Sequence, residues 1–180
     1  EWVKYRSHLS RGVTIGTMLQ DEALRFIRLG TFLERADNTA RILEVKYLNL
    51  LPGAEGDAET ADYYQWSALL RSVSAFEVYR KVYRDHITPL RVAELLILRA
   101  DMPRSLARCM KEVYSNLTRV ANSRSAETER LAGELESHLR FGRIERIFEG
   151  GLRKYLETFR DSIFDLGCRI SDDFLIPTSA

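Results

Sequence analysis

Four ionisable residues, Glu34, Arg35, Asp37 and Arg41, stand within two turns of one predicted helix. An arginine side chain carries a planar fork of N–H donors that suits a carboxylate or a phosphate. A neighbouring carboxylate can orient such a ligand, and a buried glutamate with a raised pKa can act as a general base. One interpretation of these residues is therefore a pocket in which Arg35 and Arg41 hold an anionic group that Glu34 or Asp37 orients.

Two other interpretations of this patch stay open at the level of sequence. Adjacent helix residues point about 100° apart, so Glu34 and Arg35 address different neighbours, whereas residues four apart, such as Asp37 and Arg41, form a favourable pair. An unpaired buried charge costs several kcal/mol, so a salt-bridge network between helices explains the patch equally well. An ordinary solvated face is the third interpretation. The other polar residues on these sides of the helix are Arg28, Thr31, Asn38 and Thr39.

Sequence patterns of other catalytic and metal-binding sites are missing. The three histidines, His8, His86 and His138, lie in separate segments, and none belongs to a Glu-x-x-His pair of the kind that builds di-iron sites. There is no glycine-rich phosphate loop after a strand and no Gly-x-Ser-x-Gly elbow. Cys109 and Cys168 stand apart, which suits a reducing cytoplasm and predicts small hydrophobic core residues. We expect no metal and no cofactor, and the sequence leaves open whether the chain is an enzyme.

Length and composition predict one globular domain spanning residues 1–180. The chain of 180 residues is 45% hydrophobic and 29% charged, which allows a core without disulfide or metal. The formal net charge of +1 favours neither nucleic acid nor an anionic membrane as a partner. The longest apolar run, Leu95 to Leu98, is far shorter than a membrane span of roughly 18 to 20 residues. With no visible signal peptide, we expect a cytoplasmic protein.

The patch belongs to a long helix predicted over residues 21–51. Apolar residues recur there alternately three and four positions apart, which is the spacing of one stripe on an α-helix. Asp21 is the expected N-cap and Pro52-Gly53 the expected stop. Because Ala36 and Ala40 are small, a neighbouring helix is expected to approach closely there, beside the charged patch. The stripe comprises Phe26, Leu29, Leu33, Ala36, Ala40, Leu43, Tyr47 and Leu50.

The remaining chain predicts further helices and no sheet. No segment alternates with period two for long enough to form a strand, so we predict an all-α fold, an antiparallel helical bundle of about six to seven helices. Thr88-Pro89 and Asp101-Met102-Pro103 are expected helix starts. Residues 52–62 are predicted as a loop and residues 141–151, with three glycines, as a bend. The other expected helices span 2–17, 63–86, 89–98, 104–121, 126–140 and 152–175, before a tail at 177–180.

A resemblance to a known family is carried by three segments: FIRLGTFLERADNTARILEVKY at 26–47, LLRSVSAFEVYR at 69–80 and DMPRSLARC at 101–109. They resemble the bacterial alpha-E family, an all-helical family named for its Glu-Arg motif. Thr31 departs from the bulkier or basic residue of the motif's Gly-Arg-Tyr version. The resemblance further implies that this chain is the C-terminal half of a longer protein with two tandem halves. The family's polar positions would fall on Glu34, Arg35, Ala36, Asp37, Thr39, Arg41, Arg71, Ser74, Glu77, Pro103, Arg104 and Ser105.

The resemblance also implies a functional setting. The family is associated with ATP-grasp proteins and transglutaminase-like proteases, so our leading expectation is a non-catalytic accessory or scaffold domain of a peptide-ligating or peptide-modifying system. Its partner would be an ATP-grasp-type or transglutaminase-like protein. The alternative is a small-ligand or enzymatic domain in which Glu34, Arg35 and Arg41 act with Arg71 and Glu77 on a carboxylate or phosphate. Simple completion of a larger bundle is a third possibility. We also expect self-association through the first or central helix, because a truncated bundle exposes apolar surface.

Overall fold

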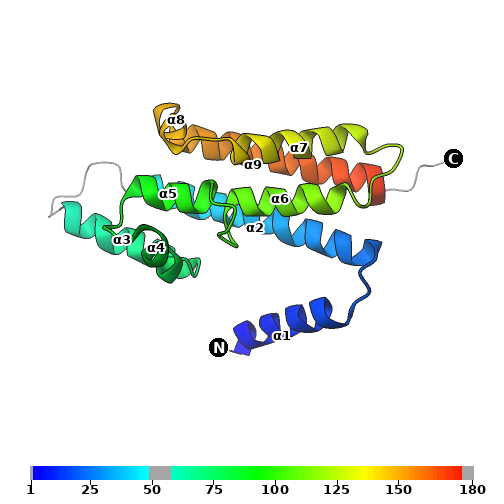
Figure 1. The fold of residues 1–180 in the computed structure, drawn as a ribbon, viewed down its shortest axis with the longest axis horizontal. Coiled ribbons are helices and arrows are strands. Elements are labelled where there is room, and N and C mark those ends of the chain that lie inside the picture. The colour runs from blue at the N-terminus through cyan, green and yellow to red at the C-terminus, as the bar shows by residue number, and fades with distance from the viewer. Residues whose placement is uncertain (1, 49–57, 176–180) are drawn as a thin grey trace.

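The computed structural model describes residues 2–48 and 58–175, and this part of the chain consists of helices and short connections (Figure 1). The absence of strands from these residues confirms the predicted all-α class. Leu50, the stop at Pro52-Gly53, the loop residues 52–57 and the tail lie outside the described residues. The elements are α1 (Trp2–Thr17), α2 (Glu22–Leu48), α3 (Ala58–Ser72), α4 (Phe76–Tyr83), α5 (Pro89–Ile97), α6 (Leu106–Leu117), α7 (Ala126–Arg140), α8 (Ile144–Glu149), α9 (Leu152–Ile170) and the π-helical turn η1 (Ser171–Leu175).

The core is built on α2, which packs against α6 and α9, while α7 packs on the other side of α6 (Figure 1). Leu29, Ala36, Ala40 and Leu43 of the predicted stripe are buried completely or almost completely. An alanine side chain ends at Cβ, so a partner helix can come close at these positions. The most extensive helix contact in the described chain is between α2 and α6, which agrees with the predicted close approach.

Two helix starts agree with the sequence. The Asp21 carboxylate accepts a hydrogen bond from the backbone N–H of Leu24 at 3.2 Å, just ahead of α2. The Thr88 hydroxyl accepts one from the backbone N–H of Arg91 at 3.3 Å, and Pro89 is the first residue of α5. Each side chain satisfies a backbone donor that has no partner inside the helix.

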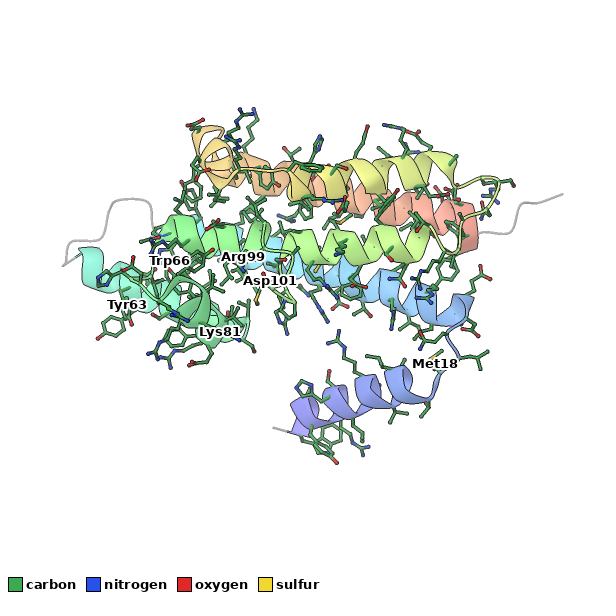
Figure 2. All side chains as sticks on the ribbon, in the orientation of Figure 1. Met18, Tyr63, Trp66, Lys81, Arg99 and Asp101 are labelled. Carbon is green, nitrogen blue, oxygen red and sulfur yellow. The ribbon has the colours of Figure 1, made fainter. Side chains whose placement is uncertain are left out.

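The predicted start at Asp101 is wrong. Asp101 binds Arg99 at 2.6 Å instead of capping a helix (Figure 2). The cap is Ser105, whose Oγ accepts the backbone N–H of Arg108 at 3.0 Å, so α6 begins at Leu106 and ends at Leu117 rather than spanning 104–121. Ser105 also donates its hydroxyl hydrogen to the carbonyl of Arg99.

The helix predicted over 63–86 is two helices, α3 and α4, and α3 already begins at Ala58. Between them Ser74 has φ 56°, in the left-handed region. The backbone N–H of Ala75 reaches back to the carbonyl of Leu70 at 2.7 Å, which closes the end of α3. The single-helix prediction was wrong because the apolar pattern continues across the break, while serine is not the glycine or asparagine that usually marks it.

The bend predicted over 141–151 contains an additional helix, α8. A Cβ added to Gly142 would lie 2.8 Å from the His138 carbonyl oxygen, and Gly151 has φ 90°. Both positions therefore favour glycine, and the two turns fold α8 between α7 and α9. The last helix also differs from its prediction, because α9 ends at Ile170 and the chain continues as η1.

The helix α1 runs beside the rest of the bundle and keeps its apolar residues exposed (Figure 1). Trp2 and Tyr5 expose 69% and 66% of their surface, and Leu9 and Val13 about half. Met18 lies in the short connection to α2 (Figure 2). Among the described helices, none combines the length and the apolar character needed to cross a membrane.

The two cysteines differ in environment. Cys109 is buried in α6, as predicted, and burial raises the pKa of its thiol to about 12. Cys168 is exposed, so its predicted place in the core was wrong. The buried positions around it in α9 are Leu166 and Ile170, and Cys168, between them in sequence, falls on another side of the helix.

Candidate functional site

The polar patch of α2 is divided between two flanks of the helix. Arg35 and Asn38 line a cleft formed with α1 and α6, whereas Asp37 and Arg41 line a groove formed with α9. Glu34 borders both hollows. This division follows from the rotation of about 100° per helical residue. The residues predicted as one patch thus belong to two neighbouring sites.

The cleft between α1, α2 and α6, which we call the arginine cleft, has a volume of about 680 Å³. Its lining includes two carboxylate residues, Glu34 and Glu112, and Glu112 is already bound to Arg108 at 2.7 Å. Five arginines against two glutamates leave a formal excess of three positive charges in the lining. Positive charge on three walls of one hollow raises the local concentration of anions. The five arginines are Arg11 from α1, Arg28 and Arg35 from α2, Arg104 from the segment that leads into α6, and Arg108 from α6.

Arg35 is positioned by its own helix and by the loop that leads into α6. Its Nη1 donates to the carbonyl of Pro103 at 3.2 Å, and its guanidinium carbon lies 5.1 Å from the centre of the Phe32 ring. Within the described chain no carboxylate pairs with Arg35. Because a guanidinium has five N–H donors, most of the fork is left without a protein acceptor.

A buried hydroxyl fastens α2 to the start of α6. Thr39 exposes only 2% of its surface, and its Oγ1 lies 2.9 Å from the carbonyl oxygens of both Arg35 and Arg104. The single hydroxyl hydrogen is shared between two acceptors, one in α2 and one just before α6. The contact holds the backbone of Arg104 beside α2. One side chain therefore fixes the positions of Arg35 and Arg104, two arginines of the cleft, relative to each other.

Asp37 and Arg41 belong to an ion-pair network between α2 and α9. The Nε of Arg41 donates to Asp37 at 2.6 Å, as the spacing predicts, and this hydrogen bond raises the pKa of Arg41. From α9, Arg160 binds Glu44 at 2.7 Å and places its Nε 3.5 Å from Asp37. For these residues the geometry favours the interhelical salt-bridge interpretation.

Three further residues implied by the family resemblance lie elsewhere. Arg71, Ser74 and Glu77 surround the break between α3 and α4, and none of them lines the arginine cleft or the groove at α9. The Arg71 guanidinium lies over the Phe76 ring, 4.5 Å from its centre. The structure therefore does not bring these residues to Glu34, and Ser105 is occupied as the buried cap of α6.

Sequence analysis missed some residues of both sites. Arg108 and Glu112 follow Arg104 at intervals of four, so they share a face of α6, and this spacing could have identified them. For Arg11 and Arg160 the sequence holds no comparable signal, because only tertiary packing places α1 and α9 beside α2.

The arginine cleft can hold an anion, and its chemistry is that of a donor site. Guanidinium groups bind carboxylates and phosphates through paired, charge-assisted hydrogen bonds. Glu34 is exposed, so the burial on which its predicted role as a general base rests is not present. No group of three or more His, Cys, Asp or Glu side chains that could hold a metal occurs among the described residues.

Neither a curated protein nor a solved structure matches the chain. Residues 1–175 match the sequence model of Alpha-E, described as a predicted alpha-helical domain with a conserved ER motif. Because this match covers nearly all of the 180 residues, the chain belongs to the Alpha-E family.

Proposed function

We propose that this chain is a non-catalytic binding domain that holds a carboxylate or phosphate group of its ligand in the arginine cleft. The observation that carries the proposal is the excess of positive charge that α1, α2, α6 and the segment leading into α6 contribute to one hollow. Arg130 on α7, by contrast, is paired with the carboxylates of Glu127 and Glu134. Arg35 has no such partner in the described chain, so an external anion would satisfy its free donors.

We further propose that Glu34-Arg35 is the Glu-Arg motif of the family description. Such pairs also occur at 129–130 and 145–146. In the pair at 129–130, Glu129 binds the Ser125 hydroxyl at 2.7 Å and Arg130 binds carboxylates of its own helix. Only the pair at 34–35 borders the arginine cleft. In this arrangement Arg35 binds the anion. Glu34, at the edge of the cleft, repels ligands that would place a second negative charge next to its carboxylate.

A partner of the ATP-grasp or transglutaminase-like type completes the proposal. Its support is membership of the Alpha-E family together with the chemistry of the cleft, since a peptide carboxylate is a group that a peptide-ligating or peptide-modifying system handles. The domain would act as an accessory that presents or anchors this group to the partner protein.

Ligand-dependent stabilisation tests the anion site. The probes are inorganic phosphate and a short peptide with a free C-terminal carboxylate, each compared with chloride and with the C-amidated peptide. We expect the melting temperature of the parent to rise with the free-acid peptide, because a ligand bound only to the folded state stabilises it. The double variant Arg35→Gln/Arg104→Gln should lose this response.

The matched control is Arg80→Gln/Arg84→Gln, which removes the same charge from exposed positions of α4 and its C-cap. It should keep the full response. Absence of stabilisation by any probe at saturating concentration, or an equal loss in the control, would show that the arginine cleft is not an anion site.

Co-purification tests the partner. The parent and the two double variants are each used as bait in the source cell. The two double variants have the same net charge. Enrichment of an ATP-grasp-type or transglutaminase-like protein by the parent and by the α4 control, but not by Arg35→Gln/Arg104→Gln, is the expected result. If neither class of protein is enriched over the cleft variant, the accessory role is wrong even where small anions bind.

Self-association is a second candidate, favoured by the exposed apolar residues along α1. We propose that α1 pairs with a second copy of the chain through Trp2, Tyr5, Leu9 and Val13, whose helical spacing puts them near one face. Light scattering at high concentration should give a mass above that of the monomer, and Leu9→Ser/Val13→Ser should return it to the monomer. A monomeric parent would contradict this candidate.

A further inference from the structure

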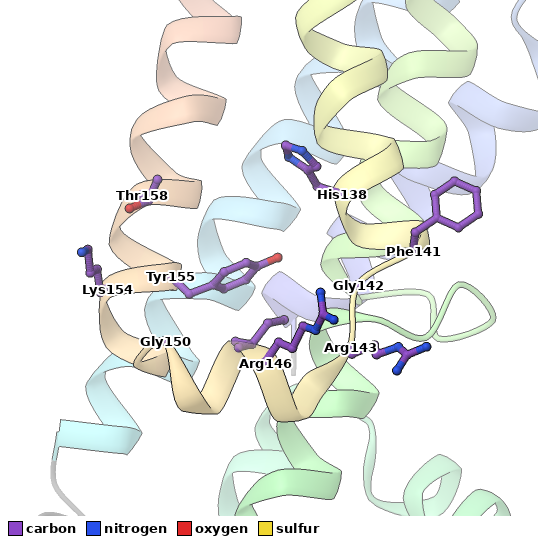
Figure 3. A pocket seen from close by; sticks show the side chains of 10 residues that line it. His138, Phe141, Gly142, Arg143, Arg146, Gly150, Lys154, Tyr155 and Thr158 are labelled. Atoms are coloured by element: carbon purple, nitrogen blue, oxygen red, sulfur yellow. The ribbon is translucent and has the colours of Figure 1, made fainter.

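A second pocket, with a volume of about 550 Å³, lies where the end of α7, the short helix α8 and the start of α9 meet (Figure 3). Arg143, Arg146 and Lys154 are among its ten lining residues, with His138 at the edge, and no lining residue is Asp or Glu. In a chain of net charge +1, a pocket whose lining carries charge of one sign only is unusual. The pocket belongs to neither flank of α2.

The cations of this pocket have no carboxylate partner in the described part of the chain. Among the side chains that the structure describes, no carboxylate forms an ion pair with Arg143, Arg146 or Lys154. Their neighbour on α9, Arg153, does have a partner, because it binds Glu157 at 2.8 Å one turn along the same helix. Lys154 has no equivalent pair, so its charge remains available to a ligand.

Tyr155 supplies a hydrogen-bond donor between these charges. Figure 3 shows its ring extending from α9 into the space below His138, with Arg146 rising from α8 toward the same space. The ring is half-buried, and no described residue accepts a hydrogen bond from its hydroxyl. Burial raises the pKa of this phenol to about 12, so it is a donor at every physiological pH. An anion in the pocket would accept this hydrogen.

The walls of the pocket are shaped by the glycine turns on either side of α8. Gly142 has no room for a Cβ against the His138 carbonyl oxygen, so the chain turns directly beneath the end of α7. Gly150 lines the pocket at the other end of α8. The apolar part of the lining includes Ile147, whereas the ring of Phe141, which is 75% exposed, extends away from the pocket (Figure 3). A hollow of this size accepts a small organic molecule rather than a bare ion alone.

We propose that this pocket binds a phosphate monoester that carries an aromatic or apolar group. Arg146 and the Tyr155 hydroxyl, which enter the same space in Figure 3, bind the phosphate oxygens, and the organic part packs against Ile147. The side chains of Arg143 and Lys154 extend to opposite sides of this space and add positive charge at its rim. A phosphate fits better than a carboxylate, because its three terminal oxygens can accept from the guanidinium fork and from the phenol at once. The site is independent of the arginine cleft and of the function proposed for it.

Isothermal titration calorimetry with phenyl phosphate, inorganic phosphate and benzoate tests the proposal. For the parent we expect phenyl phosphate to bind at least tenfold more tightly than the other two. Arg146→Gln should weaken this binding by tenfold or more, and Tyr155→Phe, which keeps the ring and removes only the donor, by a few fold. Arg153→Gln, the matched change outside the pocket, should leave the affinity unchanged.

Three results would overturn the inference. The first is no heat of binding with phenyl phosphate up to about 10 mM, which is the range of the weakest specific complexes. The second is an equal loss in Arg146→Gln and Arg153→Gln, which would indicate only general attraction to positive charge. The third is a loss of phenyl phosphate binding in Arg104→Gln but not in Arg146→Gln, which would show that the phosphate binds in the arginine cleft. If only the arginine cleft fails to bind anions, Arg146→Gln should still weaken the binding of phenyl phosphate. The two proposals can therefore be tested separately.

Discussion

Replacing Arg35 by methionine tests whether this charge supports the fold or is held for a ligand. Methionine keeps most of the length and apolar packing of the arginine stem. What it removes is one hydrogen bond to the Pro103 carbonyl, at 3.2 Å, and the contact with the Phe32 ring, at 5.1 Å. No carboxylate in the described chain is left behind without a partner.

The expected loss of stability is small. A hydrogen bond from a partly exposed charged donor contributes about 1 kcal/mol, and an exposed cation–ring contact about 0.5–1 kcal/mol. Removing one of five arginines from the cleft also relieves repulsion, which offsets part of this loss. We expect the free energy of unfolding to fall by about 1 kcal/mol. Breaking a buried ion pair from one side costs about 3–5 kcal/mol.

Arg160→Met is the comparison, because Arg160 does bridge two carboxylates. Its side chain is 24% exposed, and its removal leaves Glu44, which is 14% exposed, without its partner at 2.7 Å. We expect a loss of about 2 kcal/mol or more, since a partly buried charge is left unpaired. Urea unfolding followed by circular dichroism measures both variants. If Arg35→Met cost about 3 kcal/mol or more, or exceeded Arg160→Met, Arg35 would be a structural charge and the reasoning would be refuted.

Three further predictions concern the fold. Thr39→Val should lower the free energy of unfolding by about 1–3 kcal/mol in urea, because it leaves the Arg104 carbonyl without the hydroxyl donor that ties α2 to the start of α6, and an unchanged stability would contradict the contact. A hydrogen bond from Arg99 lowers the pKa of Asp101. The stability that this ion pair contributes to the fold is therefore present above roughly pH 4, and it is lost as the pH falls through the pKa of Asp101 in the folded protein. Asp101→Asn should therefore melt below the parent at neutral pH, with a gap that narrows in acid; a gap that widens in acid refutes the pairing. At about pH 8 a thiol reagent should modify Cys168 quickly and Cys109 only on unfolding, and two fast thiols would be inconsistent with the burial of Cys109.

Helix positions were largely predictable, because a helix depends on residues three and four apart. The stripe through Ala36 and Ala40 and the cap at Thr88 are local features, and both appear in the structure. The break at Ser74 was not predictable, since a serine rarely adopts the left-handed conformation and the apolar period continues across the break. Asp101 and Ser105 both suit a helix cap, and only the contact of Asp101 with Arg99 decides between them.

The candidate site was predictable only in part, for a related reason. The α2 residues of the arginine cleft were recognised, and so was the pairing of Asp37 with Arg41, because one helix places them. Sequence reasoning treated both sets as one patch. It could not know that α6 and α9 occupy opposite flanks, which turns Asp37 toward Arg160 and leaves Arg35 in a different hollow.

The sequence by itself determined that the chain is helical, where most helices lie and which charges meet along a single helix. These properties depend on spacing within about four residues, where the helix geometry alone sets the distances. Only the tertiary structure decided which arginines share a hollow, because Arg11, Arg35 and Arg108 come from three helices. Their meeting depends on how small residues in α2 allow α6 to approach and on where the connection after α1 directs that helix, and neither is a periodic property of the sequence.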